Sequence, residues 1–207
     1  MLGDLLPPAV RVAEVGGGDV DDLLPGEAAA LGPVGAVRRR DYAAGRHCAR
    51  RACAGLGLPA APLLPGADGA PRWPAAVVGS LTHCAGYAAA AVAHRRDLRA
   101  VGVDAEPARP LPQGVLRRVT CAAERVHLAA LPAGVPWDTV LFSAKESVYK
   151  AWSPITGRWL GFTDATLTIQ PRAGTFTARV LVPGPPRFTG RFTVRDGLIL
   201  TAVTVDP

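Results

Sequence analysis

Four short segments near the carboxyl end of the chain constrain its fold more than any other feature of the sequence. Each alternates in polarity or is rich in β-branched residues, and turn residues separate them; they are Ala165 to Gln170, Phe176 to Val182, Phe188 to Val194 and Leu198 to Val205. Because such side chains pack well on a pleated sheet, the pattern predicts four strands. With 207 residues, the chain can bury one substantial core or two small halves packed together.

The earlier part of the chain mixes further strands with helices. Apolar runs and short turns predict strands over 77–83, 87–93 and 100–106, and apolar residues at helical spacing predict helices over 37–56, 116–130 and 137–152. Residues 1–34 are weakly patterned, and the glycine- and proline-rich stretch 62–74 predicts a loop. The fold class is therefore α+β. The glycine cluster Gly16 to Gly18, followed by Asp19, predicts only a turn, because it lacks the ending of a phosphate-binding loop.

The composition excludes several classes of protein. Hydrophobic residues make up 49% of the chain and charged residues 19%, which is typical of a globular protein. The four cysteines form no Cys-x-x-Cys pair and have no paired histidines, so neither a zinc site nor a redox dithiol is predicted. The first residues carry no basic leader, and the most apolar run, Tyr87 to Ala93, is far shorter than the ~20 residues that cross a bilayer. We therefore expect a soluble, cytoplasmic protein with no membrane partner.

The net charge points to an acidic partner. The formal charge is +6, which suits nucleic acid, an anionic small molecule or an acidic protein, and charge alone does not choose among them. Nucleic acid is the least favoured, because the chain has no recognised nucleic-acid motif and only 6% aromatic residues.

Two carboxylates stand two residues apart in Val101-Gly-Val-Asp104-Ala-Glu106. On a strand, residues two apart point to the same face, and Gly102 beneath them would give a ligand room to approach the backbone. Such paired oxygens suit Mg²⁺. Taken alone, the pair is better explained as two solvated acids at the end of a strand.

Polar residues at two other places also have both a functional and a purely structural interpretation. Thr82 and His83 end an apolar strand, where they could present donors to a phosphate or serve only as turn residues. The predicted helix 37–56 carries an arginine cluster that could grip a phosphate or form a solvated face; its members are Arg38, Arg39, Arg46 and Arg50.

The stretch 141–152 holds Lys145 and Lys150, the only two lysines of the chain, on either side of Glu146. Glu146 with Ser143 fits a helix capping box, and Glu146 with Lys150 fits an exposed ion pair of about 0.3–0.5 kcal/mol. The apolar positions of the predicted helix lie on its opposite face, so Glu146 and Lys150 face either water or a cleft.

Together these motifs resemble the surfactin-synthetase type of 4′-phosphopantetheinyl transferase, and within it the enterobactin synthase component D subgroup. The resemblance covers roughly residues 34–205 and rests on four motifs in order, namely Arg38 to Arg46, Gly79 to Tyr87, Val101 to Glu106 and Phe142 to Lys150. It implies a pseudo-dimer of two similar α+β halves, 1–100 and 101–207, with the active site in the cleft between them.

The resemblance also implies an activity. Such enzymes move the phosphopantetheine arm of coenzyme A onto a serine of an apo acyl- or peptidyl-carrier protein and release adenosine 3′,5′-bisphosphate. Asp104, Glu106 and Glu146 would hold Mg²⁺, and Glu146 would also be the base, directly or through a water. Asp104, Glu146 and Lys150 are thus the implied catalytic residues.

The implied coenzyme A contacts lie in both halves. Lys150 would grip the pyrophosphate, Arg38, Arg46 and His83 the 3′-phosphate, and Thr82 a neighbouring phosphate oxygen. Lys145 is assigned to the same site by the motif alone, to orient an acid or phosphate. Relatives often place a lysine in the loop before His83, whereas the loop Leu64 to Arg72 has none, which leaves the adenine pocket unassigned.

The expected partners follow from the same resemblance. Coenzyme A and acidic carrier proteins are expected, the protein is expected to be a monomer, and no nucleic acid is expected. The carrier would dock on 111–130 through Leu116, Val119 and Val126, with Arg117 and Arg118 supplying charge. Two alternatives stay open: a nucleic-acid-binding module, and a non-catalytic relative that binds carriers.

Overall fold

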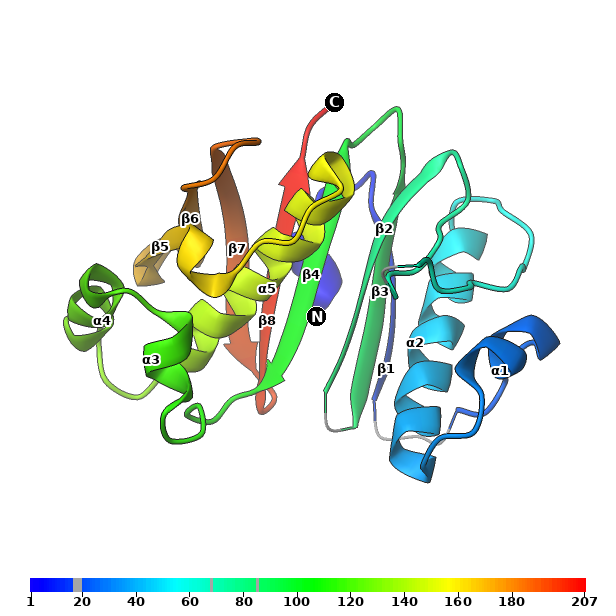
Figure 1. The fold of residues 1–207 in the computed structure, drawn as a ribbon, viewed down its shortest axis with the longest axis horizontal. Coiled ribbons are helices and arrows are strands. Elements are labelled where there is room, and N and C mark those ends of the chain that lie inside the picture. The colour runs from blue at the N-terminus through cyan, green and yellow to red at the C-terminus, as the bar shows by residue number, and fades with distance from the viewer. Residues whose placement is uncertain (17–19, 68, 85) are drawn as a thin grey trace.

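The structure is a computed structural model that describes residues 1–16, 20–67, 69–84 and 86–207. It confirms the α+β class, with helices packed on two antiparallel sheets (Figure 1). The turn predicted at Gly16 to Gly18 and Asp19 lies, from residue 17 on, outside the described residues. None of the helices within the described ranges is both long enough and apolar enough to cross a membrane.

The amino-terminal part of the chain forms a three-stranded sheet with one long helix on it. The strands pair antiparallel in the order β1-β3-β2 and comprise β1 (Arg11–Gly16), β2 (Val77–Cys84) and β3 (Tyr87–His94). Helix α2 (Ala36–Ala54) packs on this sheet through small residues, with Cys48, Ala49 and Ala52 buried against Ala88, Ala90 and Val92. The short helix α1 (Pro25–Leu31) lies on the outer side of α2 (Figure 1).

The carboxyl-terminal part forms a five-stranded antiparallel sheet in the order β4-β8-β7-β6-β5. Its strands are β4 (Ala100–Pro107), β5 (Ala165–Gln170), β6 (Thr175–Val180), β7 (Arg187–Arg195) and β8 (Leu198–Val205). The long helix α5 (Trp137–Thr156) covers one face (Figure 1), and the short helices α3 (Val115–Val119) and α4 (Ala122–Ala129) precede it. Short 3₁₀ turns occupy Leu2–Leu5, Phe162–Asp164 and Pro171–Ala173.

Most of the predicted elements are confirmed within a few residues, and three predictions are wrong. The segment 116–130 is two helices rather than one, because Thr120 and Cys121 are extended and Glu124 caps the second helix at the Cys121 amide. Ser143 and Glu146 form no capping box, because α5 begins at Trp137 and the Ser143 hydroxyl pairs with that of Thr201.

The third wrong prediction concerns Gly102. A Cβ on this residue would lie 2.0 Å from the backbone oxygen of Ser147 and 2.7 Å from the backbone nitrogen of Ala151. Helix α5 therefore occupies the space that was expected to admit a ligand. This contact lays α5 directly on β4 (Figure 1) and brings the helix face that carries Glu146 and Lys150 to the strand that carries Asp104.

The two sheets meet along β2 and β4, which run side by side at the centre of the molecule (Figure 1). Side-chain hydroxyls connect the strands, because the Val103 amide donates to Ser80 Oγ at 3.0 Å and the Ala105 amide donates to Thr82 Oγ1 at 2.9 Å. The seam between the parts is thus made by side chains of β2 reaching the backbone of β4. The division of the chain at residue 100 stays a prediction.

We predict that Gly102→Ala destabilises the protein by about 3 kcal/mol, because the new methyl group meets fixed backbone atoms rather than a side chain that can move. Urea denaturation of both proteins measures the difference. Gly16→Ala is the matched control, since it also lies in a strand and no atom of the described residues stands within 4 Å of its Cβ position. Equal destabilisation by the two substitutions would contradict this account of the α5 contact.

Candidate active site

A cavity of about 490 Å³ gathers six of the predicted site residues. Its wall includes Arg38, Arg46, Thr82, His83, Asp104 and Lys150. They come from α2, β2, β4 and α5, so both sheets contribute to one cavity. Residues far apart in the sequence therefore meet in one cavity.

A second cavity, of about 670 Å³, adjoins the first. The two share Gly69, Pro71, Leu81 and Lys150, so the Lys150 side chain stands between them. The larger cavity is walled by loop residues 66, 67 and 69–73, by β2 and by the end of α5. It suits a ligand that is long enough to extend past a central ammonium group.

Trp73 is a wall residue that the sequence analysis missed. A Cβ at Gly79 would lie 2.5 Å from the indole ring, so the ring packs flat against β2 at this glycine. The loop before it is held by its own backbone, since the Arg72 amide donates to the Leu64 carbonyl at 2.8 Å. Gly79, in the middle of a strand, was the available signal that something approaches the backbone closely.

Asp104 is the most constrained acid of the site. It is buried, and its Oδ1 accepts hydrogen bonds from Lys150 Nζ at 2.7 Å and from Thr82 Oγ1 at 3.3 Å. Lys150 also donates to the Val103 carbonyl at 3.1 Å. The other oxygen, Oδ2, is buried and has no hydrogen-bond partner among the described residues. A buried carboxylate oxygen without a partner is costly, so this atom is suited to receive a cation or a donor.

Glu106 and Glu146 are held in environments that disfavour their charge. Burial raises the pKa of Glu106 to about 7, with the nearby Asp104 and Glu146 adding to the effect. Burial also raises the pKa of Glu146, and Asp104 adds to it while Lys150 opposes it. The three acids thus act on one another electrostatically, and a bound cation would relieve their repulsion.

The predicted magnesium site is only partly formed. Within the residues that the structure describes, no three His, Cys, Asp or Glu side chains lie close enough together to hold a metal ion. In addition, the Lys150 ammonium donates to Asp104 Oδ1, so one oxygen of that carboxylate already has a partner. The carboxylates nevertheless fit Mg²⁺ in chemistry, since they offer hard oxygens and one of those oxygens lacks a partner.

The basic groups of the smaller cavity differ in burial. Arg46 is 6% exposed, donates from Nε to the Leu63 carbonyl at 2.8 Å and lies 4.0 Å above the Tyr42 ring. Burial lowers its pKa. His83 has a side chain that is 40% exposed and lies 3.9 Å from Asp41, and partial burial lowers its pKa, helped by Lys150 and Arg38.

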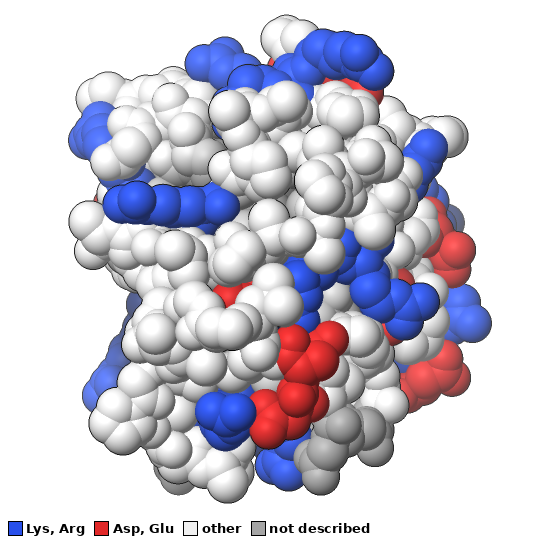
Figure 2. Space-filling model, turned by 90° about the vertical axis from the view of Figure 1, so that its right-hand side faces the viewer, with Lys and Arg blue, Asp and Glu red and all other residues white. Residues whose placement is uncertain are grey.

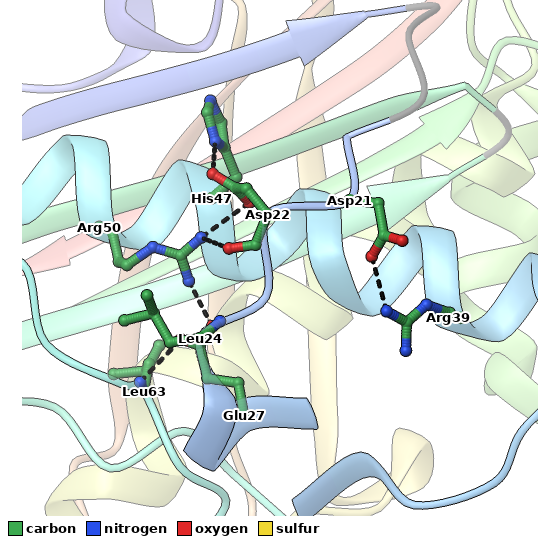
Figure 3. Close-up of polar contacts among 8 residues, drawn as sticks. All are labelled: Asp21, Asp22, Leu24, Glu27, Arg39, His47, Arg50 and Leu63. Atoms are coloured by element: carbon green, nitrogen blue, oxygen red, sulfur yellow. Dashed lines mark hydrogen bonds and ion pairs between the residues drawn. The ribbon is translucent and has the colours of Figure 1, made fainter. Parts of the chain in front are cut away.

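The other arginines of the predicted cluster point elsewhere. Arg39 pairs with Asp21 at 2.9 Å, and Arg50 bonds to Asp22 and to the buried Glu27 (Figure 3). These two guanidinium groups therefore hold the segment before α2 against the helix, and the idea that the whole cluster grips a phosphate is wrong. Figure 2 views the molecule from the right-hand side of Figure 1, and basic and acidic side chains lie close together near the middle of that face.

Three predicted site residues, Glu106, Glu146 and Lys145, line neither of these two cavities. Of the three, Lys145 is buried. Its side chain is 3% exposed, and its ammonium donates to Glu124 at 3.0 Å and to the carbonyls of Phe162 and Ala165 at 2.6 and 3.0 Å. An ammonium has three donors, so these acceptors satisfy it. Lys145 joins α4 and the start of β5 to α5.

Comparison with known proteins identifies the family. Residues 27–93 match the 4′-phosphopantetheinyl transferase N-terminal domain, and residues 100–200 match the 4′-phosphopantetheinyl transferase superfamily. The chain therefore belongs to the 4′-phosphopantetheinyl transferases, and its enzyme class is theirs.

Individual relatives agree with this assignment. The chain is 51% identical to the 4′-phosphopantetheinyl transferase Svp of Streptomyces mobaraensis, over 88% of this chain and 78% of the relative. It is 47% identical to PptT of Mycobacterium tuberculosis, over 88% of this chain and 86% of the relative. Enterobactin synthase component D of Salmonella typhi is a weaker match, 36% identical over 59% of this chain and 52% of the relative.

We predict that Glu106→Gln stabilises the protein at pH 8 without divalent cations. The folded pKa of about 7 lies above the ordinary glutamate pKa of 4.5, so the folded state holds a proton that the unfolded state releases, and stability falls as pH rises between these values. Removing the charge should gain about 2 kcal/mol at pH 8 and nothing at pH 4. Urea denaturation at both pH values tests this, and a stability difference that does not depend on pH would overturn it.

Proposed function

We propose that the protein transfers the 4′-phosphopantetheine group of coenzyme A to a serine hydroxyl of an apo acyl- or peptidyl-carrier protein. The observation that carries this proposal is the cavity that joins Arg38, Arg46 and His83 to Asp104 and Lys150. Phosphoryl transfer needs cations placed on the phosphates and an oriented nucleophile. This cavity offers the cations beside Asp104, which interacts electrostatically with Glu106 and Glu146.

Different basic side chains bind different phosphate groups of coenzyme A. Arg38, Arg46 and His83 hold the 3′-phosphate, with Thr82 near a phosphate oxygen, because these residues line the smaller cavity together. Lys150 holds the pyrophosphate, because it stands where the two cavities meet. The elongated remainder of coenzyme A fits the larger cavity, which opens on the far side of Lys150.

Glu146 acts as the base for the carrier serine, directly or through one water. Its raised pKa makes its carboxylate a stronger proton acceptor than an exposed glutamate. The serine oxygen forms a bond to the phosphorus of the phosphopantetheine unit, the bond to adenosine 3′,5′-bisphosphate breaks, and the serine proton passes to Glu146. Lys150 neutralises the charge that grows on the departing phosphate.

Asp104, Glu106 and Glu146 are the residues that would hold Mg²⁺. A bound divalent cation supplies charge neutralisation on the transferring phosphoryl group. The partnerless oxygen of Asp104 supports this assignment. Lys145 is left out of the coenzyme A contacts, because its three donors are already taken.

An apo-carrier mixed with the protein, coenzyme A and Mg²⁺ should gain the mass of one phosphopantetheine group. Glu146→Gln and Lys150→Ala should each lower kcat by at least about 100-fold, because they remove the base and the phosphate cation. Intact-protein mass spectrometry follows the product. Arg39→Ala, which removes a surface ion pair outside the cavity, is the control.

Three results would contradict this scheme. They are the absence of any mass gain with several carriers, an equal rate from Glu146→Gln, and full activity after chelation of divalent cations. Full activity after chelation would contradict the assignment of the three acids to Mg²⁺, but it would not contradict the phosphate contacts in the cavity.

The carrier docks on α3 and α4 in this proposal, through charge more than through apolar contact. Arg117 and Arg118 are exposed and suit an acidic partner. Val119, which was expected to contact the carrier, is only 3% exposed and belongs to the interior, whereas Val126 is 73% exposed. A monomeric state and a cytoplasmic location stay predictions.

The double variant Arg117→Glu/Arg118→Glu should raise KM for an acidic carrier about tenfold and leave KM for coenzyme A unchanged. The matched control is Arg96→Glu/Arg99→Glu, which changes the net charge equally at exposed positions between β3 and β4. Steady-state kinetics with both substrates separate the two effects. A similar rise in both double variants would mean that only the overall charge of the protein matters.

A further inference from the structure

Glu27 is a fully buried carboxylate that makes three polar contacts of different kinds. It lies at the third position of α1, where Oε2 accepts the amide of Leu24 at 3.0 Å and so caps the helix. The same oxygen bonds to the Arg50 guanidinium from α2, and Oε1 accepts the amide of Leu63 at 2.9 Å (Figure 3). A buried charge is tolerated only with such partners, so this carboxylate fixes three separate segments in place.

The contact to Leu63 continues toward the cavity. The Leu63 residue receives a hydrogen bond from Arg46 Nε at its carbonyl, at 2.8 Å, and donates one to Glu27 from its amide. Glu27 therefore fixes the residue that fixes the Arg46 guanidinium. Because Nε is used in this bond, the orientation of the rest of the fork is set by where the Leu63 carbonyl lies.

Glu27 also places one wall of the same cavity. It caps α1, and Ala30, Leu31 and the following Val34 line the same cavity as Arg46. Arg50 neutralises the Glu27 charge and continues to the Asp22 carbonyl and carboxylate, both at 2.8 Å. A negative charge close to an anion site is thereby balanced within the protein.

The other half of the chain contains a matching residue, Glu124, which is 2% exposed. It caps α4 at the amide of Cys121, accepts the distant amide of Leu167 at 2.8 Å and pairs with Lys145 of the long helix. Each half thus has one buried glutamate that joins a short helix, a distant loop or strand and the long helix. Of these two glutamates, only Glu27 is connected by hydrogen bonds, through Leu63, to an arginine that lines the cavity.

We propose that Glu27 is a positioning residue for recognition of the 3′-phosphate of coenzyme A, acting through Leu63 on Arg46. This inference rests on the proposed function, in which Arg46 contacts that phosphate. It goes beyond it by assigning selectivity for 3′-phosphorylated nucleotides to a residue that touches no ligand.

A positioning role and a purely structural role predict different measurements. If Glu27 only supports the fold, its loss weakens binding of coenzyme A and of 3′-dephospho-coenzyme A by the same factor. If it orients Arg46, only the ligand that carries the 3′-phosphate is affected. The ratio of the two affinities is therefore the informative quantity.

The experiment is isothermal titration calorimetry of both ligands with the full chain and its variants, checked for folding by circular dichroism. Glu27→Gln keeps the size of the side chain and removes its charge. It should lower the affinity for coenzyme A about tenfold and change the affinity for 3′-dephospho-coenzyme A less than about twofold. Glu27→Asp, which keeps the charge but cannot span all three contacts, should change the ratio in the same direction and provides a second route should Glu27→Gln fail to fold.

Glu124→Gln is the matched control, because it removes an equivalent buried capping carboxylate that does not lead to Arg46. It should leave the affinity ratio at the wild-type value. The double variant Glu27→Gln/Arg46→Ala should show the ratio of Arg46→Ala alone, because the effect of Glu27 passes through that arginine.

The outcomes separate the two levels of the proposal. If Arg46→Ala keeps the wild-type preference for coenzyme A, the proposed phosphate contact is wrong. If Arg46→Ala loses the preference but neither variant of Glu27 changes it, the phosphate contact stands and the positioning role is overturned. If the Glu27 variants lower the affinity for both ligands by the same factor, the positioning role is also overturned, because a purely structural role predicts that result.

Discussion

The active-site arrangement depends on the absence of a side chain at Gly102. Helix α5 lies so close to β4 that the missing Cβ position is 2.0 Å from a helix carbonyl. At this separation Lys150 reaches both the Asp104 carboxylate and the Val103 carbonyl. A larger residue would separate the helix from the strand, and the acids of β4 would lose the cation that balances them. The glycine of the motif thus serves helix packing, and the ligand benefits only indirectly.

The seam between the halves shares residues with the site. The Thr82 hydroxyl accepts from the Ala105 amide across the seam and donates toward Asp104, so one side chain joins the sheets and supports the acid. Ser80 repeats the first of these contacts at Val103. Any movement of one half relative to the other would therefore alter the surroundings of Asp104. This coupling explains why a cavity that both halves line can still have a defined geometry.

The sequence predicted the elements whose patterns are local and missed those that depend on distant partners. The four carboxyl-terminal strands alternate clearly, and Leu141, Ala144 and Val148 of α5 are all fully buried as the helical pattern predicted. In contrast, α1 is a short helix whose capping glutamate is held by Arg50 from α2, which no local pattern reveals. The break at Thr120 depends likewise on Glu124, whose partners lie in α5 and β5.

Among the site residues, the motifs brought six side chains into one cavity but could not distinguish ligand contacts from internal ones. Arg39 and Arg50 stand on α2 with Arg46, yet their partners are acids of the segment before the helix. Sequence spacing fixes the face of a helix, whereas the residues that cover that face come from elsewhere in the chain. The two buried glutamates show that the geometry of the acceptors decides whether arginine or lysine serves as the basic partner. Arg50 spreads a planar fork over Glu27 and Asp22, whereas three acceptors converge on the single nitrogen of Lys145. A guanidinium cannot direct its donors to one such point, so a chain that otherwise uses arginine keeps lysine there.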